Sequence, residues 1–398
     1  MSKTTDVAVI GAGPAGLTAA IALGAAGVSV TLVGRPSGDT RTTALLASSV
    51  TALETLDIWP RCRDMAAPLK VMRIVDDTGR LWRAPETEFV SEEIGLEAFG
   101  WNIQNRDFVV ALTAQIRETQ SIAWATDDAR SVVQYDNKVD IELSNGEKIS
   151  SQLVVGADGR RSICRTAAGI DTEGHDYPQT ALTFNLAHTR PHRDVSTEFH
   201  TPYGPFTLVP LKGQKSSLVW VVKPHEAERL AALDDTALAL EIEQHSHSIL
   251  GKITLEEGRG QFPLSVQTAR RFASGRIVLV GEAAHTIPPI GAQGFNLGLR
   301  DIATIAELVT EAKRDGEDIA GAHVVDTYDE RRRGDVSTRK IAIDLLNRSL
   351  LSDFLPAQGA RGLGLYMLNR VGPLRRAVMR EGVVPVKSSP KLMRGEAL

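Results

Sequence analysis

Residues 6–34, which decide the fold, read DVAVIGAGPAGLTAAIALGAAGVSVTLVG. The apolar run from Asp6 to Ile10 predicts a buried strand, because a strand that is covered on both faces has a near-continuous apolar sequence. Small and apolar residues from Gly13 to Ala26 predict a helix, and Ser29 to Val33 predicts a second strand. The order strand, helix, strand is typical of a βαβ unit and favours a parallel sheet.

The turn between the first strand and the helix is rich in glycine. Gly11, Gly13 and Gly16 are spaced as G-x-G-x-x-G, with Pro14 and Ala15 between the last two. The first glycine permits the tight turn, the second lets backbone N–H groups approach a pyrophosphate, and the third allows the helix to pack closely on the strand. Because this spacing follows a strand and opens a helix, residues 11–16 are predicted to bind a dinucleotide.

The second strand ends without the acid that usually binds the adenosine ribose. That acid normally lies about 20 residues after the glycines, but Gly34 occupies the place and Arg35 follows it. Two alternatives stay open: water or backbone groups bind the ribose, or Arg35 meets adenosine by another route.

Composition sets broad limits on the function. The chain has 398 residues, of which 42% are hydrophobic, and a formal net charge of −4, so no basic excess points to nucleic acid. Its two cysteines, Cys62 and Cys164, have no ligand spacing, so we expect neither a disulfide framework nor a metal site. Without a signal-peptide pattern or a long apolar run, we expect a cytoplasmic protein.

The rest of the chain divides by its patterns. Arg106 to Glu118 has helical spacing, Thr180 to Lys223 alternates like an antiparallel sheet, and the chain from Ala322 onward is mostly helical. The expected fold class is α/β: a Rossmann-like domain with a parallel sheet, an inserted, mainly antiparallel β domain and a helical C-terminus. We expect the nucleotide-binding domain at residues 1–70, 100–170 and 270–320, the substrate domain at 71–99 and 171–269, and the helical region at 321–398.

Two later stretches also leave a predicted strand at a turn that contains glycine. VVGADGRRSICR, from Val154 to Arg165, leaves a strand at an Asp-Gly pair, which by itself is typical of an ordinary turn. RIVLVGEAAHTIPPIGAQGFNLGLRD, from Arg276 to Asp301, runs from a strand through small residues and prolines into a helix. A helix N-terminus there can direct backbone N–H groups at developing negative charge.

The three motifs in this order resemble those of the FAD-dependent aromatic hydroxylases of the p-hydroxybenzoate hydroxylase superfamily. The resemblance spans nearly the whole chain. Six stretches are similar to the narrower branch of ubiquinone-biosynthesis hydroxylases: RTTALLASSV, FGWNIQNRDFVVAL, YGPFTLVPL, FPLSVQTARRF, GAQGFNLGLRD and YDERRRGD. That branch is also marked by Gln293 and Arg300-Asp301.

The resemblance implies FAD as the cofactor and assigns roles to particular residues. The glycines of residues 11–16 would bind the pyrophosphate, Arg41 and Arg106 the phosphate or ribityl groups, and Asp158 would support both FAD and nicotinamide handling. Glu282 stands where the family usually has Asp, so its longer side chain must fold back to reach the ribityl and pyrophosphate region. The implied cofactor-binding residues are Gly11, Gly13, Pro14, Ala15, Gly16, Gly34, Arg35, Arg41, Thr42, Arg106, Asp158, Gly281, Glu282, Pro289, Gly291, Gly294, Phe295 and Asn296. The last four would line the isoalloxazine ring or its approach.

By resemblance, the function is hydroxylation of the aromatic ring of a polyprenylated phenol in ubiquinone biosynthesis, through a flavin C4a-hydroperoxide formed with O₂. The electrons would come from NAD(P)H or a ferredoxin-like protein, and contact with a quinone-biosynthesis complex and with the inner face of a membrane is expected. The alternatives are a flavin monooxygenase acting on a small soluble aromatic, and a flavoprotein reductase or scaffold without oxygen insertion. The sequence names no catalytic residue.

Four weaker features have ordinary structural interpretations beside functional ones. His285 could be a general base, but in the family its position mostly shapes the turn. Trp101, Phe206 and Trp220 could line an aromatic pocket, although core packing is commoner. The run 331–333 of three arginines is more typical of a solvated helix face. Residues 363–384 mix apolar residues with arginines, which suits either a membrane or partner surface or ordinary helix packing.

Overall fold

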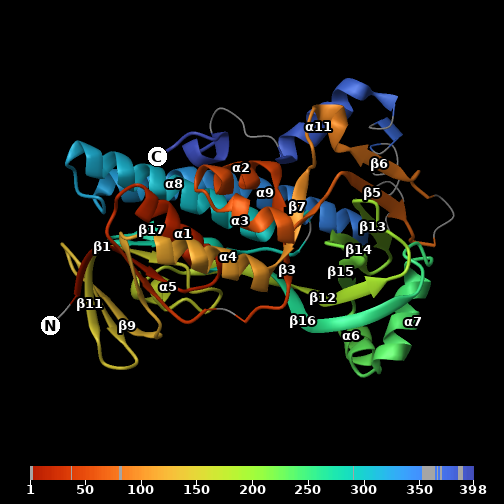
Figure 1. Cartoon of the computed structure of the whole chain (residues 1–398), viewed down its shortest axis with the longest axis horizontal. Coiled ribbons are helices and arrows are strands. Elements are labelled where there is room, and N and C mark those ends of the chain that lie inside the picture. Colours follow the sequence, from red (N-terminus) through yellow and green to blue (C-terminus); the bar gives the residue numbers. More distant parts are fainter. Residues whose placement is uncertain are drawn as a thin grey trace.

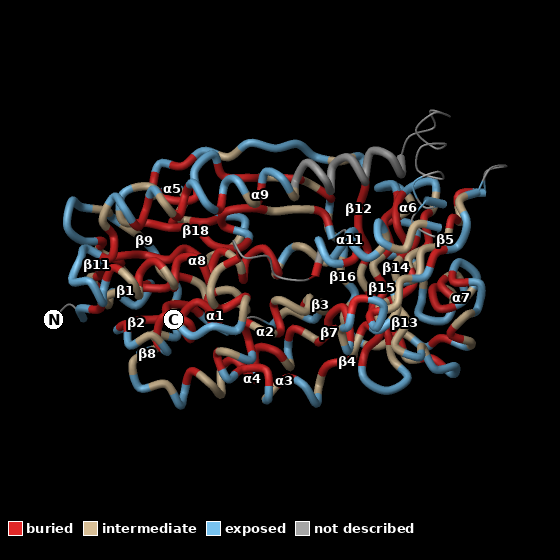
Figure 2. The backbone as a smooth tube through the Cα atoms, turned by 90° about the horizontal axis from the view of Figure 1, so that it is seen from above, coloured by how far each residue is buried: buried red, intermediate tan, exposed pale blue. Residues whose placement is uncertain are grey.

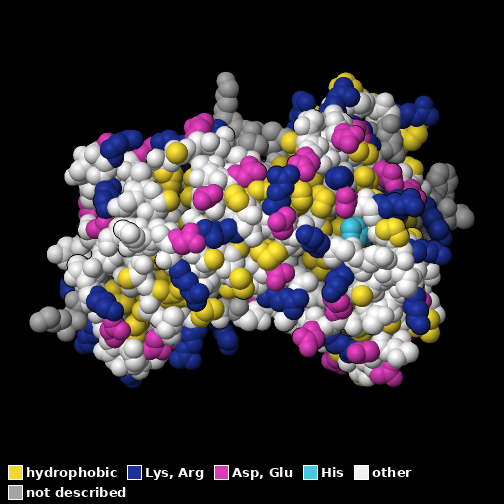
Figure 3. All heavy atoms as spheres, in the orientation of Figure 1, with side chains coloured by type: hydrophobic (Ala, Val, Ile, Leu, Met, Phe, Trp, Pro, Cys, Tyr) yellow, Lys and Arg dark blue, Asp and Glu magenta, His cyan; other side chains and the backbone are white. Residues whose placement is uncertain are grey.

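The computed structural model describes residues 3–36, 38–79, 83–289, 291–351, 364, 366–367, 370–383 and 389–398, with only the backbone for 340–351. Two large sheets lie side by side along the molecule (Figure 1). The first contains both strands of the glycine-rich βαβ unit, and the second lies beyond it. On the face in Figure 3, basic and acidic side chains are interspersed over both halves.

The first sheet contains the predicted βαβ unit. β1 (Lys3–Ile10), α1 (Pro14–Ala25) and β2 (Val30–Val33) confirm the strand–helix–strand interpretation. The main strand order is β17-β18-β11-β1-β2-β8, and along it only the β17–β18 pair is antiparallel. β10 adds to β11 and β9 adds to β10, both antiparallel. The other strands of this sheet are β8 (Ile122–Ala125), β9 (Ala129–Gln134), β10 (Val139–Leu143), β11 (Lys148–Gly156), β17 (Ala273–Ser274) and β18 (Ile277–Leu279).

The second sheet confirms the expected antiparallel region. Its strand order is β19-β16-β12-β15-β14-β13-β5-β6, and only the β13–β5 pair is parallel. Its strands are β5 (Val71–Asp76), β6 (Thr87–Val90), β12 (Thr172–His188), β13 (Val195–Thr201), β14 (Gly204–Leu211), β15 (Lys215–Val222), β16 (Ile253–Ala269) and β19 (His285–Thr286). The long strands β12 and β16 extend toward the first sheet, and β19 adds residues from the third motif to this sheet.

A third, small sheet connects the two large ones. It consists of β3 (Thr42–Leu46), β7 (Gly100–Gln104) and β4 (Ala67–Pro68), in the order β3-β7-β4. The Asn102 side chain on β7 donates to the Pro210 carbonyl of β14 at 2.9 Å, so this small sheet is hydrogen-bonded to the second large sheet.

The helices cover the sheets in layers. The first sheet is covered by α1 and the long α8, which are buried along much of their length (Figure 2). One face of the second large sheet is covered by α6 and α7. α9 follows α8, which confirms the helical C-terminus. The bounds are α2 (Ala47–Thr55), α3 (Trp59–Cys62), α4 (Asn105–Glu118), α5 (Ile163–Ala167), α6 (Pro224–Ala231), α7 (Asp235–His245), α8 (Gln293–Asp315), α9 (Ala322–Leu351) and α11 (Gly372–Val383), with short 3-10 turns at 63–65, 91–94, 281–283 and 391–394.

The aromatic residues confirm the core-packing interpretation. Phe206 and Trp220 are buried under α6 and α7, with ring centroids 5.2 Å apart, and Trp220 also lies 4.6 Å from the His245 ring. Trp101 is half-buried and meets Trp59 edge to face at 5.4 Å. These contacts place the three aromatic rings in packing roles.

The basic and apolar C-terminal stretch 363–384 lies partly outside the described residues. Within α11, Met379 and Val383 are buried against Ile94 and Phe99, so this face packs on the domain as an ordinary helix does.

Candidate flavin site

The three motifs meet at one edge of the first sheet. In the parallel register Ile10 lies opposite Gly156, and Gly156 lies opposite Leu279. Because parallel strands that are in register end at the same edge, the turns after β1, β11 and β18 leave the sheet side by side. Residues about 270 positions apart in the chain therefore form one site.

The glycines of the first motif have different tasks. A Cβ on Gly11 would lie 2.4 Å from the Ala157 carbonyl oxygen, and a Cβ on Gly16 would lie 1.7 Å from the Gly11 carbonyl oxygen. These two positions are closed by backbone packing. A Cβ on Gly13 would meet no described atom within 4 Å, so Gly13 faces open space at the start of α1.

The third motif enters this site as a tight 3-10 turn at Gly281–Ala283. A Cβ on Gly281 would lie 3.4 Å from the Ala15 Cβ of α1, and a Cβ on Gly298 of α8 would lie 3.2 Å from the Gly281 Cα. The turn is thus wedged between two helices. Only small residues allow this approach, which explains the composition of the motif.

Two helix N-termini face the site without a side-chain cap from any described residue. α1 begins at Pro14, and α8 begins at Gln293 after Ala292, which is held in the left-handed region with φ 55°. A Cβ on Gly294 would meet nothing within 4 Å of the described chain. Free N–H groups at helix starts bind phosphate oxygens and stabilise negative charge, so the residues present fit the pyrophosphate and the electron-poor ring of FAD.

Asn296 uses its side chain to tie α8 to β3. Its Oδ1 accepts from the Leu46 N–H at 2.9 Å, and its Nδ2 donates to the carbonyls of Ala44 at 2.8 Å and Ala292 at 2.5 Å. It is buried, so both polar atoms are committed to backbone. Phe295 packs edge to face on Phe108 at 5.3 Å.

Asp158 caps its own turn. Its Oδ1 accepts from the Ser162 hydroxyl at 2.6 Å, and its Oδ2 accepts from the Cys164 N–H at 3.1 Å. Arg165 then donates to the carbonyl of Ala283 at 2.9 Å, which joins the second motif to the third. Asp158 therefore supports the shape of the site through backbone, and Arg165 is a connecting residue that sequence reasoning missed.

Arg41 is paired with Asp39 and lies within electrostatic reach of Glu282. The Arg41 guanidinium bonds both carboxylate oxygens of Asp39 at 2.8 to 3.0 Å and stacks 5.1 Å from the Phe262 ring centroid. The hydrogen bond to Asp39 raises the pKa of Arg41, and Glu282 raises it further. Glu282 is exposed and makes no hydrogen bond with any described residue, so its carboxylate is free to accept one.

The remaining candidates lie at the borders. Arg106, at the start of α4, is exposed and pairs weakly with Asp107 at 3.7 Å. The Thr42 hydroxyl donates to the Ser217 hydroxyl at 3.0 Å, across to the second large sheet. Pro289 and Gly291 are exposed on the approach to α8.

Gly34 has a backbone reason for replacing the usual acid. Its φ is 139°, which L residues rarely adopt, and a Cβ there would lie 2.8 Å from the Ala12 nitrogen. Its carbonyl accepts from Trp124 Nε1 at 2.9 Å, and the neighbouring Arg35 pairs with Asp127 at 3.1 Å. The strand end is therefore built for glycine.

Restoring the usual acid should consequently damage the site. We expect Gly34→Glu to lower the free energy of unfolding by about 2 kcal/mol or more, from the disfavoured φ and the contact with Ala12. Thermal unfolding followed by circular dichroism measures this. Wild-type stability together with tighter FAD binding would contradict the explanation.

His285 is a structural residue in this geometry. Its side chain has 0% exposure, and its Nε2 lies 2.7 Å from Asp301 Oδ2. A ring so enclosed cannot contact a substrate, which leaves the turn-shaping interpretation.

The interpretation of the arginine run as a solvated face is wrong for one member. The side chains of Arg331 and Arg333 are 52% and 54% exposed, but that of Arg332 is 3% exposed and its Nε donates to Asp301 at 2.7 Å. The charge run hides this because the three residues are identical. Spacing along α9 was the available signal, since the apolar positions Val325 and Tyr328 precede Arg332 on a buried helix face.

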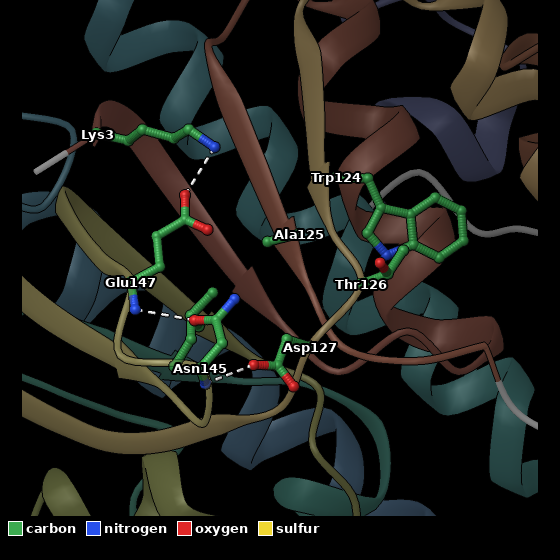
Figure 4. Close-up of a pocket in the computed structure, with 8 residues that line it drawn as sticks. Lys3, Trp124, Ala125, Thr126, Asp127, Asn145 and Glu147 are labelled. Atoms are coloured by element: carbon green, nitrogen blue, oxygen red, sulfur yellow. Dashed lines mark hydrogen bonds and ion pairs between the residues drawn. The ribbon is translucent and has the colours of Figure 1, made fainter.

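A cavity of about 420 Å³ lies beside the hairpin turn Asn145–Glu147 (Figure 4). The pair between Lys3 and Glu147, at 2.7 Å, spans it, and Asp127 accepts from the Asn145 N–H. None of the residues that line it belongs to the three motifs, so we do not assign it to the flavin.

Comparison with known proteins decides the family. The family model described as an FAD binding domain matches residues 4–339. The ubiquinone hydroxylase UbiL of Rhodospirillum rubrum is 32% identical over 408 residues, which cover 100% of this chain and 94% of that protein. The chain belongs to the FAD-dependent ubiquinone hydroxylases. This flavoprotein hydroxylase is thus an FAD-dependent monooxygenase, as the resemblance implied.

One further relative agrees with this family, and one solved structure agrees with the fold. The 3-demethoxyubiquinol 3-hydroxylase of Escherichia coli is 28% identical over 390 residues, covering 95% of this chain and 98% of that protein. The crystal structure of p-nitrophenol 4-monooxygenase PnpA from Pseudomonas putida superposes with a TM-score of 0.76 at 21% identity, covering 96% and 98%. The latter supports the fold alone.

Proposed function

We propose that this hydroxylase inserts one oxygen atom into the aromatic ring of a polyprenylated phenol during ubiquinone biosynthesis. The observation that supports it best is the convergence of three motifs and two uncapped helix starts at one sheet edge, in a chain whose relatives are ubiquinone hydroxylases. The relatives support an aromatic quinone precursor as the substrate class, with O₂ and a reductant as co-substrates. The polyprenyl chain and the ring position belong to the proposal.

The geometry of the sheet edge, together with the family resemblance, supports a proposal for the residues that would hold FAD. The α1 N-terminus at Gly13 would bind the pyrophosphate, and N–H groups at the α8 N-terminus around Gly294 would stabilise negative charge on the pyrimidine ring. Glu282 would accept a hydrogen bond from a ribityl hydroxyl near the pyrophosphate, within electrostatic reach of Arg41. When bound, FAD supplies the redox chemistry and the activation of O₂. The chain contributes N–H groups, orientation and shielding from water.

The substrate ring is proposed to bind at the junction of the two large sheets. Asn185 donates to the Thr40 carbonyl at 3.2 Å, and Ser217 is hydrogen-bonded to Thr42, so this face of the second sheet lies against the segment that carries Arg41.

The electron donor, the partner proteins and the cellular location also belong to the proposal. NAD(P)H or a ferredoxin-like protein would reduce the flavin, and contact with a quinone-biosynthesis complex or the inner membrane face would deliver the prenylated substrate. None of the helices in the described parts of the chain combines the length and the apolar character of a membrane span.

The role of Glu282 gives a direct test. Glu282→Ala should raise the Kd for FAD about tenfold, the effect of losing one hydrogen bond to a charged group. Glu282→Asp should keep most of the affinity, whereas Glu330→Ala, an exposed acid on α9, should change nothing. Flavin fluorescence quenching during titration measures all three. Undiminished FAD affinity in Glu282→Ala would refute the assignment.

The substrate proposal needs a cellular experiment. A deletion strain should accumulate a prenylated phenol that lacks one hydroxyl, and mass spectrometry of quinone intermediates would identify the ring position. If quinone levels are unchanged but the purified yellow protein hydroxylates a small phenol, the soluble-aromatic alternative holds. Flavin that is reduced without oxygen insertion into any phenol would favour the reductase or scaffold.

A further inference from the structure

One buried carboxylate is hydrogen-bonded to both ends of the turn that begins at Gly281. Asp301, on α8, has 0% side-chain exposure. Its Oδ2 accepts both the Gly281 N–H at 3.0 Å and the His285 Nε2 at 2.7 Å. Gly281 and His285 are the first and last residues of the loop from the 3-10 turn into β19. A single oxygen atom therefore holds both ends of the loop that carries Glu282.

The same carboxylate is anchored to a different helix. Its Oδ1 accepts from Arg332 Nε of α9 at 2.7 Å, and Arg332 Nη1 donates to Asp335 Oδ2 at 2.5 Å. Arg300 of α8 also donates to Asp335, at 2.7 Å. Burial by itself would raise the pKa of Asp301, but His285 and Arg332 lower it, so the acid is ionised in place.

A purely stabilising role does not account for this arrangement. Buried ion pairs contribute little net stability compared with apolar residues of the same size, because desolvation offsets their attraction. What the hydrogen bonds of such a pair provide is a fixed geometry, because each bond sets the direction of both partners, although His285 Nδ1 and Arg332 Nη2 have no described partner here. Here the geometry is that of the loop between Gly281 and His285.

We propose that Asp301 is a positioning residue that holds the Gly281–His285 loop in the shape that binds FAD, with Arg332 of α9 as its counter-ion. The proposal rests on the proposed function, because the loop must be part of the flavin site. It makes α9 a support of that site although no residue of α9 belongs to the three motifs.

Asp301→Asn tests the proposal with nearly the same shape. An amide has one oxygen, so it cannot accept from Gly281 and His285 on one side and from Arg332 on the other. Either the donors of the loop or the donor of Arg332 then face the amide NH₂ group, which cannot accept a hydrogen bond. Arg332→Gln tests the other partner, because it leaves Asp301 buried without its counter-ion.

Two matched controls lie on the same helix. Asp329 is also buried and accepts from the Phe272 N–H at 2.6 Å, outside the loop, so Asp329→Ala should lower Tm without changing FAD affinity. Arg331→Gln removes the same side chain as Arg332→Gln, one position earlier and in solvent, and should change neither.

The measurements are the Kd for FAD, Tm and the visible circular dichroism of bound flavin, which reports the ring environment. We expect Asp301→Asn and Arg332→Gln to raise the Kd about tenfold or more, equal to about 1.4 kcal/mol, and to alter the flavin spectrum. If both variants bind FAD as the wild type does while Tm falls as in Asp329→Ala, the network is only structural and the proposal is overturned.

Arg332→Lys covers the case in which these variants do not fold. It keeps the buried positive charge but cannot bridge both acids with a planar fork, so it should fold and bind FAD several-fold more weakly. A wild-type Kd in Arg332→Lys would overturn the proposal. If instead the wild-type protein binds no flavin at all, the proposed function fails and not merely this role of Asp301.

Discussion

Gly16→Ala should unfold the flavin site, whereas Gly13→Ala should leave the fold intact and weaken only the binding of FAD. A methyl group at Gly16 would lie 1.7 Å from the Gly11 carbonyl oxygen, a contact that cannot form unless α1 moves off β1. We expect a loss of more than about 3 kcal/mol in the free energy of unfolding. At Gly13 the added methyl meets no described atom within 4 Å.

The Gly13 variant is the control and a test at once. Ala is compatible with its φ of −80°, so Tm should match the wild type. The methyl group would occupy the space at the α1 N-terminus, and the Kd for FAD should rise at least about tenfold, by loss of one or more N–H contacts to phosphate. Denaturant unfolding and FAD titration of both variants check this. A Gly13→Ala variant with unchanged FAD affinity would show that the pyrophosphate lies elsewhere.

Asn296→Ala should cost about 3 kcal/mol of stability and most of the bound flavin. It removes three hydrogen bonds to backbone and leaves the Leu46 N–H and the Ala44 carbonyl without their partner in a buried place. Each buried polar group left unpaired costs about 1–3 kcal/mol. β3 would then separate from α8, and the segment that follows Arg41 would lose its position.

Urea unfolding and the flavin content of the purified protein measure this effect. Gln293→Ala is the matched control, because Gln293 begins the same helix but bonds only Gly291, on the surface, among the described residues. That variant should keep wild-type stability within about 0.5 kcal/mol. Equal losses in the two variants would show that the helix start, and not the clamp to β3, is what matters.

Local patterns were sufficient for the first unit and for the order of the motifs. The periodicity of residues 6–33 predicted β1, α1 and β2, and the glycine spacing predicted a turn that opens a helix. These features depend on neighbours in the chain, so a window of some 30 residues contains them. The resemblance then carried the fold, the cofactor and the hydroxylase family, which the comparisons confirm.

Side-chain roles were harder to predict, because each depends on what lies across the fold. Asp158 was predicted to support FAD, and only the structure shows that its carboxylate also bonds Ser162 and Cys164 in its own turn. Only the structure shows that Asn296 joins α8 to β3 through backbone groups. Apolar spacing along α9 could mark Arg332 as buried, but its pairing with Asp301 follows only from the packing of α9 against α8. Gly34 departs from the family pattern for a reason that only its contact with Ala12 shows.

By itself, the sequence determined that this chain has a βαβ nucleotide-binding unit, three motifs in the hydroxylase order and a family. Tertiary structure alone decided that the turns after Ile10, Gly156 and Leu279 share one edge, and that Asp301 and Arg332 lie buried beneath the last of them. The physical reason is that propensity and spacing act between near neighbours, whereas burial removes water from groups distant in the chain. A charge becomes a structural constraint only where packing forces it to find a partner.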